Sequence, residues 1–233
     1  MKDIFGTALL DYYHGNYTED LITETNISEE DELPLPYLFR NFAEMPSIEQ
    51  QALQLSVGHV LDVGCGAGSH ALYLQEKGLE VTAIDTSEGA VKVSALRGVK
   101  NVRQLPLLEL KDEKFDTILL LMNGAGIFQK VKHISNYLKH LKSLLATKGQ
   151  ILVDTSDLKY MYDQEADGGI WVPGDRYYGE LTFTVRYKGK SGKPFDWLYL
   201  DEHLFEDACL TNNLTFEVVA RGENYDYLAR ITA

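Results

Sequence analysis

Cysteine, membrane-length apolar runs and basic residues are all scarce in this chain of 233 residues. It has two cysteines, Cys65 and Cys209, which excludes a disulfide scaffold and favours a reducing, cytoplasmic location. The longest uncharged stretch with an apolar centre, residues 117–129, is too short to cross a bilayer. No small-residue cleavage site of a secretory signal follows the N-terminal apolar run. We therefore expect a soluble protein with no membrane partner.

The charge is strongly negative. Lys and Arg number 22 against 35 Asp and Glu, so the formal net charge is −13. Such a surface repels phosphate backbones, and no nucleic-acid partner is expected.

Apolar residues at 45% and a chain of this length are sufficient for one domain with its own core. No His/Cys cluster has the spacing of metal ligands, so we predict no metal.

The N-terminal residues 1–46 predict a cap of helix and loop. Residues 18–34 contain seven acids and no base, which favours a solvated loop over a mobile lid. Short helices are predicted over 37–42 and from 46 to 55.

Residues 47–155 alternate between strand and helix patterns and predict the cofactor-binding core. Alternation of this kind is typical of a parallel sheet with helices on both faces. The predicted strands are 59–63, 79–84, 99–105, 115–122 and 150–154, and the predicted helices are 69–77, 87–96 and 131–145.

The pattern changes after residue 155. Residues 180–187 alternate in hydropathy, and 195–199 run back after a Lys/Gly-rich turn, which predicts an antiparallel hairpin inside an inserted cap over 156–204. Residues 205–233 then predict a closing helix and strand pair. We expect residues 1–233 to form a single domain.

The sharpest motif is the run Val-Leu-Asp-Val-Gly-Cys-Gly-Ala-Gly over residues 60–68, between a predicted strand and a predicted helix. Its glycines let the backbone turn tightly and approach a ligand. Asp85 ends the next strand, where a carboxylate can accept hydrogen bonds from both hydroxyls of a ribose. A nucleoside-containing cofactor is therefore expected at the carboxyl end of the sheet. Ser69 stands where a dinucleotide fingerprint needs its third glycine.

The G-x-G-x-G spacing behind Asp62 resembles motif I of class I S-adenosylmethionine-dependent methyltransferases. Residues 79–87, 115–120 and 148–153 resemble the second, fourth and fifth strands of that family, so the likeness covers about residues 55–155. It implies an α/β fold, namely a doubly wound, seven-stranded, mostly parallel sheet (the Rossmann-like methyltransferase fold) with an antiparallel β-hairpin insertion. It also implies S-adenosylmethionine as cofactor.

The same resemblance implies the cofactor site. The glycines would hold the amino acid part with help from Asp62, Asp85 would bind the ribose, and Asn123 would line the methionine portion. Cys65 is a spacer with no nucleophilic role, and Gln104 or a backbone group would replace the acid that often binds adenine. The predicted cofactor-binding residues are Asp62, Gly64, Cys65, Gly66, Gly68, Asp85, Thr86, Asn123 and Gly124.

Methyl transfer needs alignment more than acid–base chemistry, and a general base helps only when the acceptor must lose a proton. The candidates are Asp154, Asp157 and Tyr13, although either aspartate could equally be a cap or loop residue. His70 is interpreted as a helix-face residue. Arg40 could bind a carboxylate or pair with an acid, and the sequence leaves both open.

Aromatic residues are abundant, with 14 tyrosines and two tryptophans. In the resembling architecture the acceptor pocket is built from the segments that contain Tyr12, Tyr13, Tyr17, Trp171, Tyr177 and Tyr178. Aromatic walls with carboxylates suit an apolar or cationic small molecule, although packing explains any single tyrosine equally well. We predict methyl transfer to a small-molecule acceptor. The alternatives are a protein acceptor, an S-adenosylmethionine-binding protein without turnover and a nicotinamide-dependent reductase. The oligomeric state is not predicted.

Overall fold

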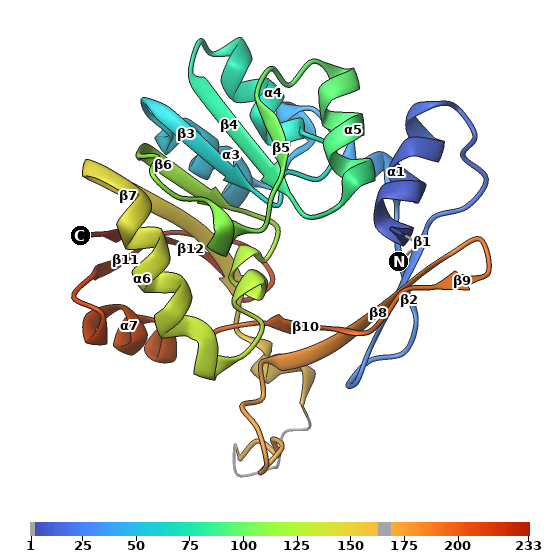
Figure 1. Cartoon of the computed structure of the whole chain (residues 1–233). Coiled ribbons are helices and arrows are strands. Elements are labelled where there is room, and N and C mark those ends of the chain that lie inside the picture. Colours follow the sequence, from blue (N-terminus) through green and yellow to red (C-terminus); the bar gives the residue numbers. More distant parts are fainter. Residues whose placement is uncertain (1–2, 163–168) are drawn as a thin grey trace.

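The structure is a computed structural model that describes residues 3–162 and 169–233. Its main sheet has seven strands (Figure 1), ordered β11 (Thr215–Arg221), β12 (Asp226–Thr232), β7 (Leu145–Ser156), β6 (Phe115–Leu120), β3 (His59–Val63), β4 (Glu80–Asp85) and β5 (Val102–Gln104). β12 runs antiparallel to both neighbours, and every other pairing is parallel. The predicted doubly wound, mostly parallel sheet is confirmed.

Helices cover both faces of this sheet (Figure 1). One face packs against α6 (Ile134–Leu144) and α7 (Glu202–Thr211), and the other against α3 (Ser47–Leu55) and α4 (Ser69–Glu76). In β6, Ile118 faces the first pair of helices and Leu119 faces the second. A central parallel strand is buried on both faces, which explains why residues 118–120 of β6 are all apolar.

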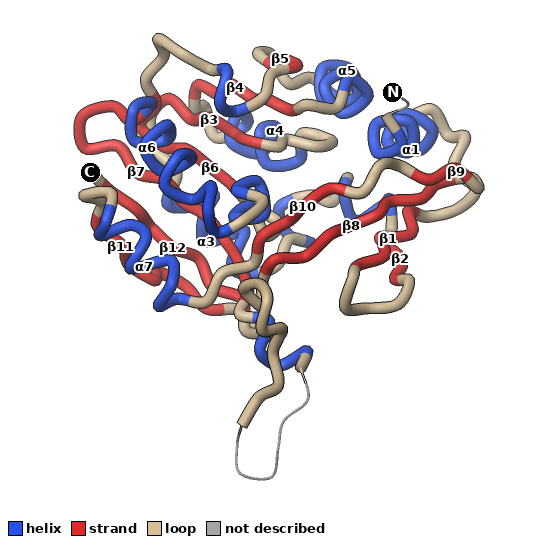
Figure 2. The backbone as a smooth tube through the Cα atoms, turned by 60° about the horizontal axis from the view of Figure 1, so that its bottom comes forward, coloured by secondary structure: helices blue, strands red, loops and turns tan. Residues whose placement is uncertain are grey.

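A second sheet contains the predicted hairpin and more. Its order is β10 (Phe195–Leu198), β8 (Glu180–Tyr187), β1 (Leu21–Thr25) and β2 (Asp31–Leu33), with β9 (Lys190–Ser191) paired to β8 (Figure 2). The expectation of a loop over 18–34 is wrong, because both β1 and β2 lie there. Arg186 of β8 forms ion pairs with Glu24 and Glu30, so a distant base neutralises part of the acidic run.

The first helix, α1 (Ile4–Tyr13), was not predicted, although Asp3 before an apolar run is an N-cap signal. Asp3 accepts hydrogen bonds from Gly6 N at 2.8 Å and from Gly89 N at 2.9 Å. A Cβ on Gly89 would lie 2.5 Å from the backbone of Gly6. The glycine pair therefore lets α1 cross closely over α5 (Glu88–Arg97).

Several boundaries differ from the predicted ones. β7 extends further in both directions, and β5 is shorter. α2 (Leu35–Leu38) begins earlier than expected, directly after Pro34. The 3-10 helices are η1 (Phe42–Glu44), η2 (Leu107–Glu109), η3 (Gly124–Phe128), η4 (Val131–His133) and η5 (Leu158–Met161). No helix in the described ranges has the length and apolar character needed to cross a membrane.

Candidate functional site

The glycine loop turns sharply between β3 and α4. Gly64 N and Cys65 N both donate to the carbonyl oxygen of Ile84, at 2.8 and 3.1 Å, so the loop is bound to the neighbouring strand. Gly66 has φ +54°, and a Cβ built on it meets no heavy atom within 4 Å. Gly68 differs, because its Cβ would lie 2.8 Å from Ser94 Oγ. Gly66 therefore borders open space, whereas Gly68 allows close packing against α5.

Asp85 joins this loop to the end of β4. Its Oδ2 accepts from Gly66 N at 2.9 Å and its Oδ1 accepts from Ser87 N at 2.8 Å. Burial raises the pKa of Asp85, and the two backbone hydrogen bonds oppose that rise. Thr86 is exposed, and its carbonyl accepts from Gln104 Nε2 at 3.1 Å. The structure thus places Gln104 beside the predicted ribose-binding residues.

Asp62 has a buried oxygen with no partner. The residue is only 2% exposed, and its Oδ2 has no hydrogen-bond partner among the described residues. Burial raises the pKa of this carboxyl group. A buried polar atom without a partner costs free energy unless a ligand satisfies it. The amino group of a bound ligand fits this position.

Arg40, Glu49 and His70 form a buried cluster beside the glycine loop. Arg40 donates to Glu49 Oε1 at 2.5 Å, and His70 Nε2 lies 2.7 Å from Glu49 Oε2. Burial alone would raise the pKa of Glu49, but its contacts with His70 and Arg40 hold it below the usual value. Arg40 therefore pairs with an acid, yet its buried Nε has no partner. Glu49 was missed, because a single acid in a first helical turn carries no distinctive signal.

A hydrogen bond to Asp154 of β7 holds the loop after β6 in place. Asn123 has φ +56°, and its Oδ1 accepts from Ser156 Oγ at 3.0 Å. Gly124 N donates to Asp154 Oδ1 at 2.9 Å. Burial raises the pKa of Asp154 to about 6, although the backbone N–H groups of Gly124 and Asn123 oppose that rise. The structure brings these three predicted residues together.

Asp157 is engaged away from this loop. It caps η5 by accepting from Lys159 N at 3.0 Å, and its Oδ1 also accepts from Tyr178 OH at 2.8 Å. Tyr177 OH donates to Asp201 Oδ2 at 2.7 Å. These tyrosines tie the segment after β7 to the start of α7.

The N-terminal tyrosines serve packing and local hydrogen bonds. Tyr13 OH donates to the carbonyl of Leu96, in the last turn of α5, and the structure does not bring it to the Asp154 loop. The Tyr12 ring packs on Phe39 with centroids 4.5 Å apart, and Tyr17 OH donates to Asp20. Trp171 lies at the surface with 71% of its area exposed.

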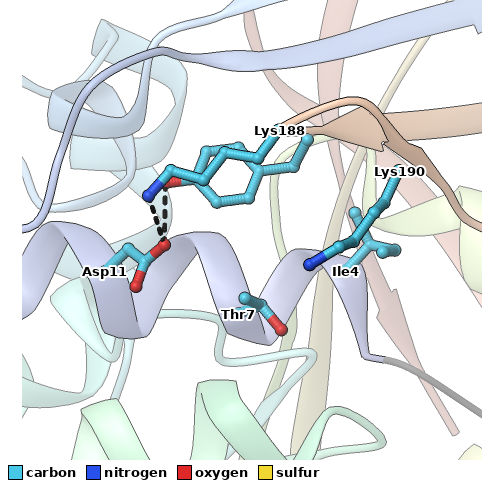
Figure 3. Close-up of a pocket in the computed structure, with 6 residues that line it drawn as sticks. Ile4, Thr7, Asp11, Lys188 and Lys190 are labelled. Atoms are coloured by element: carbon cyan, nitrogen blue, oxygen red, sulfur yellow. Dashed lines mark hydrogen bonds and ion pairs between the residues drawn. The ribbon is translucent and has the colours of Figure 1, made fainter.

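Cys65 and a small surface pocket are not part of the candidate site. Burial raises the pKa of the Cys65 thiol, so it remains protonated near neutral pH and packs in the core. A small pocket lies between α1 and the β8–β9 turn, where Asp11 is bound to both Tyr187 and Lys188 (Figure 3). None of the residues that line this pocket comes from the carboxyl ends of β3, β4 or β6, where the candidate site lies. Within residues 3–162 and 169–233, no group of three or more His, Cys, Asp or Glu side chains could hold a metal ion.

Aromatic rings on β10 and beside it were also missed. A Cβ on Gly126 of η3 would lie 1.9 Å from Trp197 Cε2, so the indole lies directly on that glycine. Tyr199 and Phe183 stack beside it, with centroids 6.4 Å apart. The alternation of Phe195, Trp197 and Tyr199 is the signal that could have placed these rings on one face.

The comparisons with known proteins agree with this geometry. A family model described as a methyltransferase domain matches residues 37–200. The whole chain superposes, with TM-score 0.93 and 42% identity over 95% of the other chain, on a SAM-dependent methyltransferase from Bacteroides fragilis, solved in complex with S-adenosyl-L-homocysteine.

Curated relatives match over shorter stretches. The putative methyltransferase YqeM of Bacillus subtilis is 29% identical over 104 residues, which is 42% of each chain. The ubiquinone biosynthesis O-methyltransferase of Rickettsia conorii is 32% identical over 100 residues, covering 40% of this chain and 35% of that protein. This chain thus aligns with less than half the length of either relative.

Proposed function

The chain belongs to the methyltransferase-domain family and has the class I S-adenosylmethionine-dependent fold, and we propose that it transfers the methyl group of S-adenosylmethionine to a small-molecule acceptor. The glycine motif, together with the strand-like segments 79–87, 115–120 and 148–153 that follow it in order, predicted this family, fold and cofactor from the sequence.

One observation carries the proposal. The open backbone at Gly66, the Asp85 carboxylate and the unpartnered Oδ2 of Asp62 lie together at the carboxyl ends of β3 and β4. A ligand with an ammonium group and a ribose satisfies both aspartates. Gln104 would contact the base of such a ligand, and Asn123 would border its methionine portion. Arg40 Nε, also buried and unpartnered, is suited to the carboxylate of such a ligand.

When bound, S-adenosylmethionine supplies an electrophilic methyl group. The protein has to orient it in line with the acceptor and exclude water. If the acceptor must lose a proton, Asp154 is the titratable group nearest the loop of Asn123 and Gly124. Asp157 and Tyr13 are bound to other groups. The name of one curated relative, a ubiquinone biosynthesis O-methyltransferase, supports an oxygen acceptor.

Calorimetric titration of S-adenosylmethionine and S-adenosylhomocysteine tests the cofactor site. Wild type should bind both at one site, and Asp85→Ala should weaken binding by about tenfold to a hundredfold, as for a lost charged hydrogen-bond partner. Ser87→Ala is the matched control, because it perturbs the same turn but keeps the carboxylate. Its affinity should stay within about threefold of wild type. Folded wild-type protein that binds neither ligand would contradict the proposal.

Turnover needs a separate measurement. Methyl-labelled S-adenosylmethionine incubated with hydroxyl- and amine-bearing small molecules should yield S-adenosylhomocysteine and a labelled acceptor. Binding without product formation would favour the alternative of a binding protein without turnover. Titration with reduced and oxidised nicotinamide cofactors tests the reductase alternative, against which Ser69 already counts.

A further inference from the structure

Four rings line one face of the second sheet, and we call Phe183, Phe195, Trp197 and Tyr199 the aromatic wall. Register places Phe183 opposite Phe195. Directly opposed residues of an antiparallel pair project to the same face, and residues two apart on one strand do so as well. Because Trp197 lies on Gly126 of η3, this face is turned toward the main domain.

The rings of the aromatic wall are in mutual contact. Phe183 stacks with Phe195 at 6.0 Å between centroids and with Tyr199 at 6.4 Å. Phe195 meets Trp197 edge-on at 6.0 Å. Phe195 nevertheless has 42% of its area exposed. Phe195 is the first residue of the edge strand β10, and it forms the exposed rim of the wall.

The wall is continuous with the candidate reaction site. Trp197 contacts η3, which begins at Gly124, the residue bound to Asp154. Burial raises the pKa of Tyr199, and the charge of Asp154 adds to that rise, so this ring and carboxylate lie within electrostatic reach. The rings thus lead from the exposed rim at Phe195 to the candidate reaction site.

The charges acting on the nearby rings are mainly negative. Burial is the largest cause of the raised pKa of Tyr37. Arg40, which is paired with Glu49, lowers that pKa, and the acids Glu49, Asp154 and Asp226 each raise it. Asp226 also raises the pKa of Tyr160. An anionic acceptor would be repelled here, whereas a neutral or cationic one would not.

We propose that the acceptor is a planar aromatic compound without negative charge that stacks on the aromatic wall, with its reacting group toward Asn123 and Asp154. The inference rests on the proposed function and adds the substrate class. Stacked and edge-on ring pairs provide geometry-specific affinity beyond burial, which a saturated ring of equal size does not obtain.

The test is an NMR titration of small probes with saturating S-adenosylhomocysteine present. Phenol, aniline and indole are the aromatic probes, cyclohexanol tests planarity, and benzoate tests charge. At least one aromatic probe should bind five- to tenfold more tightly than both cyclohexanol and benzoate. Phe195→Ala should weaken that binding about threefold to tenfold. Because Phe195 is substantially exposed, this variant removes little core.

Phe42→Ala is the matched control, since Phe42 stacks on Tyr73 outside the wall and its loss should leave probe affinity unchanged. Phe195→Leu keeps an apolar side chain but removes the ring, and should behave like Phe195→Ala. Equal binding of cyclohexanol, no aromatic binding, or an unchanged affinity in both Phe195 variants would overturn the inference. Those results, with S-adenosylhomocysteine still bound, would leave the proposed function intact. Failure of S-adenosylhomocysteine itself to bind would instead count against that function.

Discussion

Asp154 offers a direct test of the electrostatics of the site. The carboxyl group is buried, with 6% of the residue exposed, and its pKa is raised from 3.8 to about 6. The native state therefore holds this proton more tightly than the unfolded chain. Stability contributed by the protonated form is present below pH 3.8 and is lost as the pH rises through about 6. Asp154→Asn cannot titrate and should not show that loss.

The magnitude follows from the two pKa values. A difference of about two units corresponds to about 3 kcal/mol over the full window, and to about 2 kcal/mol between pH 4.5 and 7.5. The free energy of unfolding of Asp154→Asn minus that of wild type should therefore rise by about 2 kcal/mol over this range. Taking the difference between the two proteins removes the pH dependence that the other titratable groups contribute to both. The amide oxygen can still accept the hydrogen bond from Gly124 N.

Urea unfolding at five pH values, without cofactor, measures this difference. Asp207→Asn, at an exposed position on α7, gives the background for removing a surface carboxyl group. A stability difference for Asp154→Asn that is flat between pH 4.5 and 7.5 would refute the reasoning. So would a difference that falls with pH, because Asp154 would then be stabilised as the anion.

Three further substitutions probe separate contacts. Asp62→Asn removes a buried charge with an unpartnered oxygen, so the melting temperature should rise while affinity for S-adenosylhomocysteine falls about tenfold; a lower melting temperature would contradict this. Glu49→Ala leaves Arg40 buried without its partner and should cost about 3–5 kcal/mol in urea unfolding, so a loss below 1 kcal/mol would show that the pair is not buried as described. Gly126→Ala places a Cβ within the Trp197 indole and should cost about 1–3 kcal/mol, with a shift in tryptophan emission. Adding Trp197→Leu to this variant should recover most of the loss, and no recovery would argue against the contact.

The main sheet was predictable because its signals are local. The strand β6 ends in the apolar run of residues 118–120, and α6 repeats Ile134, Leu138 and Leu141 at helical spacing, so short windows are sufficient to place both elements. The second sheet was only half predicted. Its hairpin is local, but β1 joins it by pairing Ile22 with Arg186 and Thr25 with Phe183, residues that lie far apart in the sequence. The acids near β1 indicated a solvated loop because their base, Arg186, lies far along the chain.

The cofactor side and the acceptor side of the candidate site also differ in whether local sequence or long-range contacts determine them. The cofactor side is built from consecutive strand ends, and its glycine loop and Asp85 lie within one strand–helix–strand unit, so a contiguous motif predicts it. The acceptor side depends on how β10 lies on η3, where Trp197 covers Gly126, and no short window contains both residues. Contacts of this kind can change without disturbing the glycine loop. Substitutions in the aromatic wall should therefore alter acceptor affinity while leaving the affinity for S-adenosylhomocysteine unchanged, so that cofactor binding and acceptor choice are physically separable in this fold.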